Sequence, residues 1–390
     1  MIKSFFTLVI LTFIILFKQT AISFAQIPTV SSNLVRIIDT SLWSPPSPDP
    51  AGITYLPNTN SLLISDSEVD EMTIYQNANV YQSSLDGTLL RIANTLSFSR
   101  EPTDVAVDLP NNLYYFSDDD QKKIFVVDLG SDNTFGTVDD RVQSFTTLGF
   151  NCTDPEGIAL GNGKLYIACG IDAKITILSP GGNGVFDGVS PSGDDQATSF
   201  STANFNQNDL EGIEYNPQNN TLFIVSTSAR MVAEVTTGGS IIRNIDISSF
   251  NIRVPAGLEY APSSIDPLAK NLYIVARGVD NNADPTENDG KIYEISFSLN
   301  SPQNSPTPSR TPTPVSATNT IQPTRTPTPI SVCARKSQGD ANCDGLIDLI
   351  DFEIWRREFI GSATTRNADI NMDGLVNLID FEFWRRTFSR

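Results

Sequence analysis

The feature that most constrains the fold is a pattern of short apolar runs that repeats along the first three quarters of the chain. The repeats begin about every 50 residues, and each has a second and a third apolar run, with a fourth in four of the five. Four short strands per repeat are typical of β-propeller blades. The five openings are Ala51-Gly52-Ile53, Thr103-Asp104-Val105, Glu156-Gly157-Ile158, Glu211-Gly212-Ile213 and Ala256-Gly257-Leu258.

The fifth repeat ends at Phe297 without a fourth run, and an isolated run stands near the start of the chain. That run, LVRIIDT from Leu34, resembles the fourth runs TLLRIANT from Thr88 and SIIRNIDIS from Ser240. An N-terminal strand paired with the last strand would close the ring and remove its exposed edges. We therefore expect a mainly β chain with a five-bladed propeller closed by its N-terminal strand. Six blades and a two-sheet sandwich are the alternatives.

Charge narrows the functions that the chain can have. Lys and Arg total 26 against 45 Asp and Glu, and the net charge of -19 argues against nucleic acid or an anionic membrane surface as partner. The chain has no histidine, which excludes Ser-His-Asp and Cys-His nucleophiles and His-ligated zinc or iron. Any catalysis must use carboxylates, Lys, Tyr or a hard metal ion, and cations are the expected ligands.

The N-terminus indicates export. Lys3 precedes the apolar run from Phe5 to Phe17, and Ala25 ends a small-x-small sequence typical of a signal-peptidase site. Residues 1–25 are predicted to be a signal peptide and the protein to be secreted, with no membrane span after cleavage. A membrane anchor is the alternative, although the run is short for a span.

Four cysteines would then lie in an oxidising compartment, where disulfides persist. Each of two pairs can form a bridge, but free thiols and other pairings stay open, because sequence does not fix connectivity. The cysteines are Cys152, Cys169, Cys333 and Cys343.

A Pro/Thr-rich tract containing SPTPSRTPTP and PTRTPTP divides the chain. Such tracts favour extended polyproline II and act as spacers. The predicted organisation is a propeller in 26–297, a linker in 298–335 and a small helical module in 336–390.

This module contains two calcium-loop patterns, DANCDGLIDLID and DINMDGLVNLID. Oxygen ligands alternate along each loop, Gly allows a sharp turn at position 6, and Asp closes the loop at position 12. The sequence predicts two Ca²⁺ ions. Their ligands would be Asp340, Asn342, Asp344, Leu346, Asp348 and Asp351 in the first loop, and Asp369, Asn371, Asp373, Leu375, Asn377 and Asp380 in the second.

With Asp at position 12 and one helix after each loop, residues Gly339 to Phe388 resemble type I dockerins, whose EF-hand-like repeats attach secreted proteins to cohesin domains on scaffolds. The resemblance implies a cohesin partner, and a cellulosome-like complex that degrades polysaccharides. Leu-Ile at loop positions 10 and 11 departs from the small polar residues often found there, which implies an unusual contact. Carried over by position, the cohesin surface comprises Leu349, Ile350, Arg356, Arg357, Leu378, Ile379, Arg385 and Arg386.

The propeller resembles the SdiA-regulated and esterase-like phytase groups through the EGI motifs at Glu156 and Glu211 and the strands LFIVS and LYIVA. Because a fold does not assign an activity, three roles stay open. They are a platform that binds a ligand or protein, a calcium-dependent phosphoesterase, and a glycoside hydrolase.

Loops that enter each first strand and loops between second and third strands should share one face, and that face is acidic. A carboxylate cluster there can hold Ca²⁺ that binds a phosphate ester and activates water. A glycoside hydrolase needs two carboxylates and usually aromatic sugar platforms, yet Trp43 is the only tryptophan of this region. The candidate catalytic residues are Glu156, Glu211 and Asp104. The other acids on this face are Asp49, Glu101, Asp154, Asp209, Asp66, Glu68, Asp70, Glu71, Asp280, Asp284, Glu287 and Asp289.

Two further acidic loops lie between third and fourth runs, which places them on the opposite face. They are predicted either as structural calcium sites or as plain turns. Their acids are Asp132, Asp139, Asp140, Asp187, Asp194 and Asp195.

Overall fold

The computed structural model describes residues 27–205, 207–228, 230–279, 284, 286–297, 339–341, 347, 349–359, 367–370, 376–377, 380–381 and 384–385. The predicted signal peptide and linker lie outside these residues. The chain divides into two compact units, within residues 1–307 and 308–390. Over the described ranges, no helix has the length and apolar character needed to cross a membrane.

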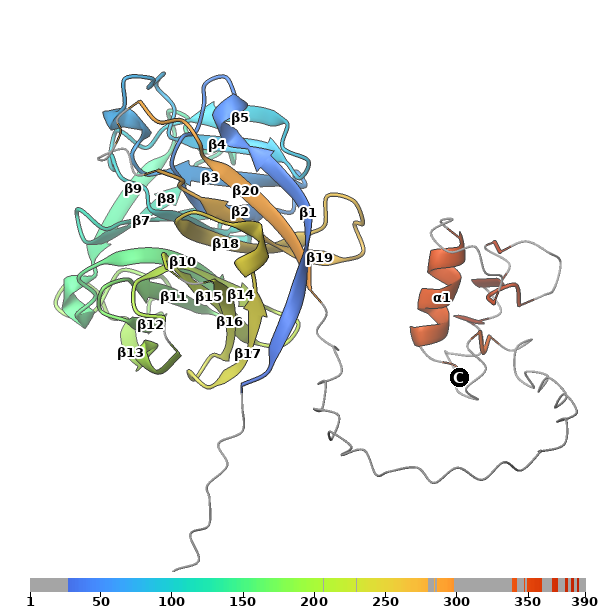
Figure 1. Cartoon of the computed structure of the whole chain (residues 1–390). Coiled ribbons are helices and arrows are strands. Elements are labelled where there is room, and N and C mark those ends of the chain that lie inside the picture. Colours follow the sequence, from blue (N-terminus) through green and yellow to red (C-terminus); the bar gives the residue numbers. More distant parts are fainter. Residues whose placement is uncertain are drawn as a thin grey trace, which may run out of the picture. The chain divides into compact units, whose positions relative to one another are not determined.

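Three antiparallel sheets in the first unit each contain four strands that are consecutive in the chain (Figure 1). Their strands are β2 (Pro50–Leu56), β3 (Ser61–Asp66), β4 (Val80–Ser84) and β5 (Leu89–Ala93); β6 (Asp104–Asp108), β7 (Leu113–Asp118), β8 (Lys123–Asp128) and β9 (Arg141–Thr146); and β10 (Pro155–Gly161), β11 (Lys164–Cys169), β12 (Lys174–Ser179) and β13 (Gln196–Ser201).

A fourth, eight-stranded sheet has the order β14-β15-β16-β17-β1-β20-β19-β18. Its strands are β1 (Thr29–Asp39), β14 (Leu210–Asn216), β15 (Thr221–Ser226), β16 (Met231–Thr236), β17 (Ile241–Asp246), β18 (Pro255–Pro262), β19 (Lys270–Ala276) and β20 (Lys291–Phe297). Short 3-10 helices connect the strands of this unit, namely η1 (Thr40–Leu42), η2 (Val69–Glu71), η3 (Leu109–Asn111), η4 (Leu148–Phe150), η5 (Ala203–Phe205) and η6 (Ser248–Phe250).

The strand β1 joins the two ends of the propeller region. Its first residues, Thr29 to Ser31, pair in parallel with β17, and the stretch from Ser32 to Asp39 pairs antiparallel with β20. Figure 1 shows β1 running along β20 and down to β17. The predicted pairing of the N-terminal strand with the last strand is confirmed, whereas its parallel pairing with β17 was not expected.

The first strands of the repeats form an inner ring in which β2, β6, β10, β14 and β18 each contact the next, and β18 contacts β2. Glycines make this approach possible. A Cβ atom on Gly157 would lie 2.9 Å from the Cα of Gly212, and one on Gly257 would lie 2.9 Å from the Cα of Gly52. The glycine that recurs in these openings is therefore required by packing between neighbouring strands.

Burial is greatest in the second strands of the first four repeats and lowest in the fourth strands. Every residue of β3 and β15 is buried, which fits strands covered on both faces, whereas β9 and β13 are mostly exposed. Apolar side chains of neighbouring sheets form shared clusters, such as Leu62 and Tyr81 with Tyr273. The first unit is thus a mainly β, propeller-like fold.

The second unit contains helix α1 (Leu349–Phe359). Trp355 and Trp384 are buried and pack with Phe352 and Phe381, so both tryptophans are core residues. Their burial identifies them as reporters of folding in this unit.

Candidate metal site formed by carboxylates of three sheets

Five half-buried acids from three neighbouring sheets gather where the strands of the inner ring begin; we call them the carboxylate cluster. Glu101 precedes β6, Asp119 follows β7, Asp154 precedes β10, and Glu156 and Glu211 are the second residues of β10 and β14. They form one group because in four of the five the charge of at least one other member raises the pKa. The arrangement fits the prediction that loops entering the first strands and loops between the second and third strands share one face.

The centre of the cluster has the dimensions of a cation site. Asp119, Asp154 and Glu156 each offer a carboxylate oxygen, and these atoms lie within 4.8 Å of one another. Two oxygens bound to one Ca²⁺ at about 2.4 Å can be at most about 5 Å apart, so the spacing fits. One oxygen of Asp119 is buried and has no hydrogen-bond partner among the described residues.

Burial and mutual repulsion make these carboxyl groups reluctant to ionise. Burial and then the charge of Asp119 raise the pKa of Glu101 to about 9. Burial and Asp209 raise the pKa of Glu211 to about 8, and burial and Asp154 raise that of Asp119 to about 6. Burial and Glu211 raise the pKa of Glu156 well above its ordinary value. In the described part of the chain no Lys or Arg pairs with the five, so charge balance requires protons or a bound cation.

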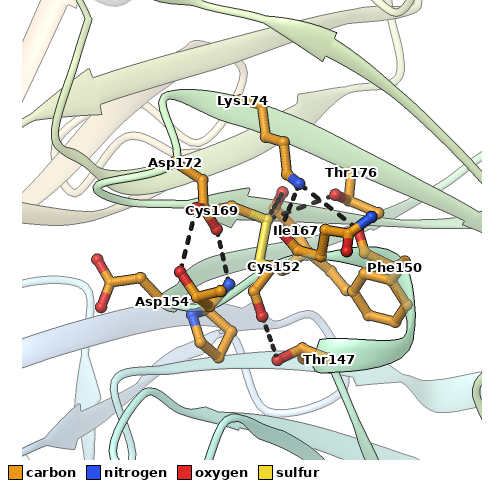
Figure 2. Close-up of a disulfide and its surroundings, with 12 residues drawn as sticks. Thr147, Phe150, Cys152, Asp154, Ile167, Cys169, Asp172, Lys174 and Thr176 are labelled. Carbon is orange, nitrogen blue, oxygen red and sulfur yellow. Dashed lines mark hydrogen bonds between the residues drawn. A yellow bond between two sulfur atoms is a disulfide. The ribbon is translucent and has the colours of Figure 1, made fainter.

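Asp154 is held by a cross-linked segment, which Figure 2 shows. Cys152 and Cys169 form a disulfide, and the hydroxyl of Thr147 donates to the Cys152 carbonyl at 2.8 Å. The Ile171 N–H donates to the Asp154 carboxylate at 2.9 Å. The disulfide therefore fixes the loop that carries this member of the cluster to the end of β11. Cys333 and Cys343 lie outside the described residues.

Asp104 takes no part in the cluster. It stands on β6 where other first strands have Gly, and its carboxylate accepts the N–H groups of Ile53 at 3.1 Å, Val105 at 2.8 Å and Ile158 at 2.8 Å. Burial raises its pKa. Through these contacts the Asp104 side chain connects three sheets. Both of its carboxylate oxygens accept backbone N–H groups, so neither is directed to a substrate.

The remaining acids predicted for this face form local contacts. Asp66 accepts the Ser47 hydroxyl and the Val69 N–H, Glu68 pairs with Arg277, and Asp70 pairs with Arg100 at 2.8 Å. Asp209 accepts the Thr227 hydroxyl at 3.0 Å and adds its charge to Glu211. Of the other acids, Glu71 lies in the loop between β3 and β4, Asp49 directly precedes β2, and Asp284, Glu287 and Asp289 lie in the loop between β19 and β20. Asp280 lies outside the described residues.

Sequence reasoning missed Asp119. Its signal was the run Asp118-Asp119-Asp120 between the second and third strands of a repeat, a loop class already assigned to the acidic face. Glu101, Asp154, Glu156 and Glu211 lie on the face where the pattern placed them.

A pocket of about 390 Å³ opens among the later residues of the five inner strands. Glu214, Glu259 and Lys270 line it with Tyr55 and Tyr215. Glu259 accepts the Tyr55 N–H at 2.8 Å. The inner strands thus carry acids towards both of their ends.

Both predicted calcium loops of the C-terminal unit contain the same hydrogen bond. The Ala341 N–H donates to Asp351 at 2.7 Å, and the Ile370 N–H donates to Asp380 at 2.8 Å, so position 2 is bonded to position 12 in each loop. Asp340, Asp351 and Asp380 are buried, which fits ligands that face inward. Asp369 and Asn377 are described as well. The remaining predicted ligands, Asn342, Asp344, Leu346, Asp348, Asn371, Asp373 and Leu375, lie outside the described residues.

Part of the predicted cohesin surface can be placed. Ile350 is 56% exposed, and Arg357 and Arg385 are exposed. Arg356 is half-buried, and Leu349 begins α1. Leu378, Ile379 and Arg386 lie outside the described residues.

Comparisons with known proteins assign both units. The SdiA-regulated family matches residues 47–249, and the dockerin type I domain matches residues 338–388. No curated protein sequence matches the chain significantly.

Solved structures resemble the first unit only distantly. The glutaminyl cyclase of Myxococcus xanthus is 12% identical over 70% of this chain and 98% of its own, with a TM-score of 0.44. The PQQ-bound aldose sugar dehydrogenase of Streptomyces coelicolor is 13% identical over 68% of this chain and 98% of its own, with a TM-score of 0.40. Likenesses at this level say nothing about activity. The family matches are the informative ones, and by them the chain belongs to the SdiA-regulated family and carries a type I dockerin domain.

Proposed function

We propose that this protein is a secreted, calcium-binding dockerin protein that attaches a β-propeller to a cohesin-bearing scaffold or cell surface. The observation that carries the proposal is the dockerin match over both calcium loops, each with the same bond from position 2 to Asp at position 12. The buried disulfide and the apolar N-terminal run support export.

Two Ca²⁺ ions would be held by the twelve predicted loop positions. The described members fit, because a buried carboxylate at position 12 faces the start of its own loop in both repeats. Bound calcium would neutralise these acids and stabilise a unit whose apolar core is small.

Intrinsic tryptophan fluorescence of the full chain tests calcium binding, because two of the three tryptophans, Trp355 and Trp384, lie in the dockerin core. Calcium should shift the emission to shorter wavelength and a chelator should reverse the shift. The double variant Asp351→Ala/Asp380→Ala should show no shift. An identical response in this variant would refute calcium binding at these loops.

We also propose that the propeller has five blades, with β1 completing the last one. The closed cycle of contacts among β2, β6, β10, β14 and β18 supports this count, as does the pairing of β1 with β20. A six-bladed ring would need another inner strand between two of these, and the five are already neighbours.

For the propeller itself, we propose a binding platform in which the carboxylate cluster holds a divalent cation that contacts a carbohydrate or phosphate-ester ligand. The three carboxylates within 4.8 Å, together with the absence of a described basic partner, support this role. A hard cation bound by few protein oxygens keeps coordination positions open for ligand oxygens.

Hydrolysis is the second candidate, in the form of a phytase-like phosphoesterase or a glycoside hydrolase. It is favoured by the raised pKa of Glu211, about 8, which lets this carboxyl group stay protonated at neutral pH near other carboxylates. A protonated acid beside a carboxylate is the arrangement that acid–base hydrolysis requires.

One set of assays separates the two candidates. The full chain is incubated with phytate or plant polysaccharides, with Ca²⁺ or chelator, and both release of product and retention of ligand are measured. Glu156→Gln and Glu211→Gln are compared with Glu214→Gln, a matched control three residues further along β14. Calcium-dependent retention without turnover supports the platform, and turnover lost in the first two variants supports hydrolysis. If neither retention nor turnover occurs, both roles fail for these ligand classes.

A further inference from the structure

Two neighbouring sheets carry the same loop between their third and fourth strands. One loop joins β8 to β9 and the other joins β12 to β13 (Figure 1). Each contains a buried phenylalanine, Phe135 or Phe186, and each ends in a pair of aspartates just before the fourth strand. The two loops can therefore be compared position by position.

The second aspartate of each pair accepts N–H groups from the two residues after the phenylalanine. Asp140 accepts those of Gly136 at 2.7 Å and Thr137 at 3.2 Å. Asp195 accepts those of Asp187 at 3.0 Å and Gly188 at 2.8 Å. These equivalent bonds show that the backbone follows a similar path in this part of both loops. Asp187 therefore occupies the position that Gly136 has in the other loop.

The first aspartate of each pair also has the same role. Asp139 accepts the Ser131 N–H at 2.8 Å, and Asp194 accepts the Gly182 N–H at 2.8 Å. The loops differ in three respects: Asp187 adds a carboxylate after the phenylalanine, Asp132 stands where the other loop has Asn183, and the β12–β13 loop is longer between its phenylalanine and its aspartate pair.

This added carboxylate completes a group of three. Asp187, Asp194 and Asp195 each offer an oxygen, and these atoms lie within 4.8 Å of one another. The β8–β9 loop also has three described acids, Asp132, Asp139 and Asp140, but their oxygens do not form such a group. The spacing in the β12–β13 loop suits oxygens that share one hard cation.

Asp195 supplies an independent sign of a ligand. Asp195 is only 3% exposed, and one of its carboxylate oxygens takes both N–H groups. The other oxygen is buried and has no partner at hydrogen-bond geometry among the described residues, although the Gly181 N–H also favours the charged form of this carboxylate. Asp140 also has one such oxygen, but that residue is only half-buried. A buried carboxylate oxygen left unsatisfied disfavours the folded state, and a cation removes that penalty. No Lys or Arg occurs between Ile175 and Ser201 to neutralise the three acids, and no described ion pair involves them.

Glycines let the backbone come close to these carboxylates. A Cβ atom on Gly193 would lie 1.9 Å from an oxygen of Asp187, and one on Gly181 would lie 2.2 Å from an oxygen of Asp194. The close backbone offers carbonyl oxygens to a cation that requires six to eight oxygen ligands.

We propose that the β12–β13 loop is a Ca²⁺ site formed by Asp187, Asp194 and Asp195. The β8–β9 loop, which has Gly136 at the position of Asp187 and whose three acids do not converge, is not such a site. This site is separate from the dockerin loops and from the carboxylate cluster. It lies between the two outer strands of the sheet whose inner strand, β10, carries Glu156.

Hydrogen exchange read by mass spectrometry tests the site in the full chain, because it resolves the two loops independently of other calcium sites. With Ca²⁺ in place of chelator, exchange in a peptide covering 180–195 should slow at least tenfold, and a peptide covering 129–140 should not change. Asp187→Asn should abolish the protection and lower the calcium bound at equilibrium by one ion per chain. Asp139→Asn, the control in the neighbouring loop, should leave both unchanged.

Three outcomes would overturn the proposal. These are equal exchange in 180–195 with Ca²⁺ and with chelator, equal protection of both loops, and unchanged calcium stoichiometry in Asp187→Asn. Exchange of the β12 and β16 amides in chelator shows whether each variant is folded, so that loss of protection in an unfolded variant is recognised. In that case Asp194→Asn replaces it and must lose the protection.

Discussion

Asp104 and four glycines occupy the same position in the five strands of the inner ring. Glycine leaves room for the neighbouring strand, and Asp104 fills the room in β6 with a carboxylate that accepts three N–H groups from three sheets. The recurring motif predicted that Asp104 occupies the position of the glycines, but it did not predict that Asp104 bonds the neighbouring strands instead of leaving space for them. A substrate-facing acid and a buried connecting acid have the same sequence letter, and only the surrounding N–H groups distinguish them.

Replacing Asp104 should therefore reduce stability and leave activity or ligand retention unaffected at temperatures where the protein is folded. Asp104→Ala leaves three buried N–H groups without an acceptor, which costs about 2 to 5 kcal/mol of unfolding free energy. Asp108→Ala, at the half-exposed end of the same strand, should cost much less. Chemical denaturation measures both, and equal costs would contradict the connecting role.

Glu259 should make the stability of the propeller fall as pH rises. Burial raises its pKa to about 7 from 4.5, so the folded state keeps a proton that the unfolded state loses. Glu214, Asp104 and Lys270 face the same region, and the raised pKa values of the two acids act in the same direction. The stabilisation is present below pH 4.5 and is lost towards pH 7, by roughly 3 kcal/mol. Glu259→Gln should flatten this slope, whereas Glu71→Gln, an exposed control, should retain it.

Among the elements, the strands were the most predictable and their partners less so. The apolar runs predicted the second and third strands of each repeat and the fourth strands of four repeats, for example SLLISD, which is β3. The pairing of β1 with β20 followed from the missing fourth run. The parallel pairing of Thr29 with Asn244 could not be predicted, because it depends on where the chain enters the ring and leaves no periodic signal.

The carboxylate cluster was only partly predictable, because repeat position indicates which face a residue lies on but not which residues of other sheets it contacts. Repeat position placed Glu156 and Glu211 at equivalent points on β10 and β14, but closeness to Asp119 depends on the twist of separate sheets. The disulfide was open as well, since a spacing of 17 residues allows a bridge without requiring one.

The disulfide gives a prediction for one element, the segment from Asn151 to Asp154. Replacing both cysteines, in Cys152→Ser/Cys169→Ser, removes a cross-link over a separation of 17 residues and should cost roughly 3 kcal/mol of unfolding free energy. It should also weaken cation binding at the carboxylate cluster, because Asp154 is no longer held. Isothermal titration with Ca²⁺ checks this. Unchanged affinity in the folded variant would show that the Ile171 N–H and the surrounding loop suffice to hold Asp154.

At the scale of the whole molecule, the high content of acidic residues favours the binding of calcium. A net charge of -19 spread over two units opposes compact folding, and bound cations offset that repulsion. The dockerin loops, the carboxylate cluster and the β12–β13 loop each place carboxylates near one another with few basic partners. Calcium availability would then control both the proposed attachment and the stability of the protein.

Attachment is the central claim, and binding of the full chain to immobilised type I cohesins measures it most directly. The chain should be retained in Ca²⁺ and released by a chelator. Asp351→Ala/Asp380→Ala should not be retained, and Glu156→Gln, which leaves the dockerin intact, should bind like the unaltered chain. Absence of retention on every type I cohesin of a diverse panel, or retention that a chelator does not reverse, would contradict a calcium-dependent dockerin.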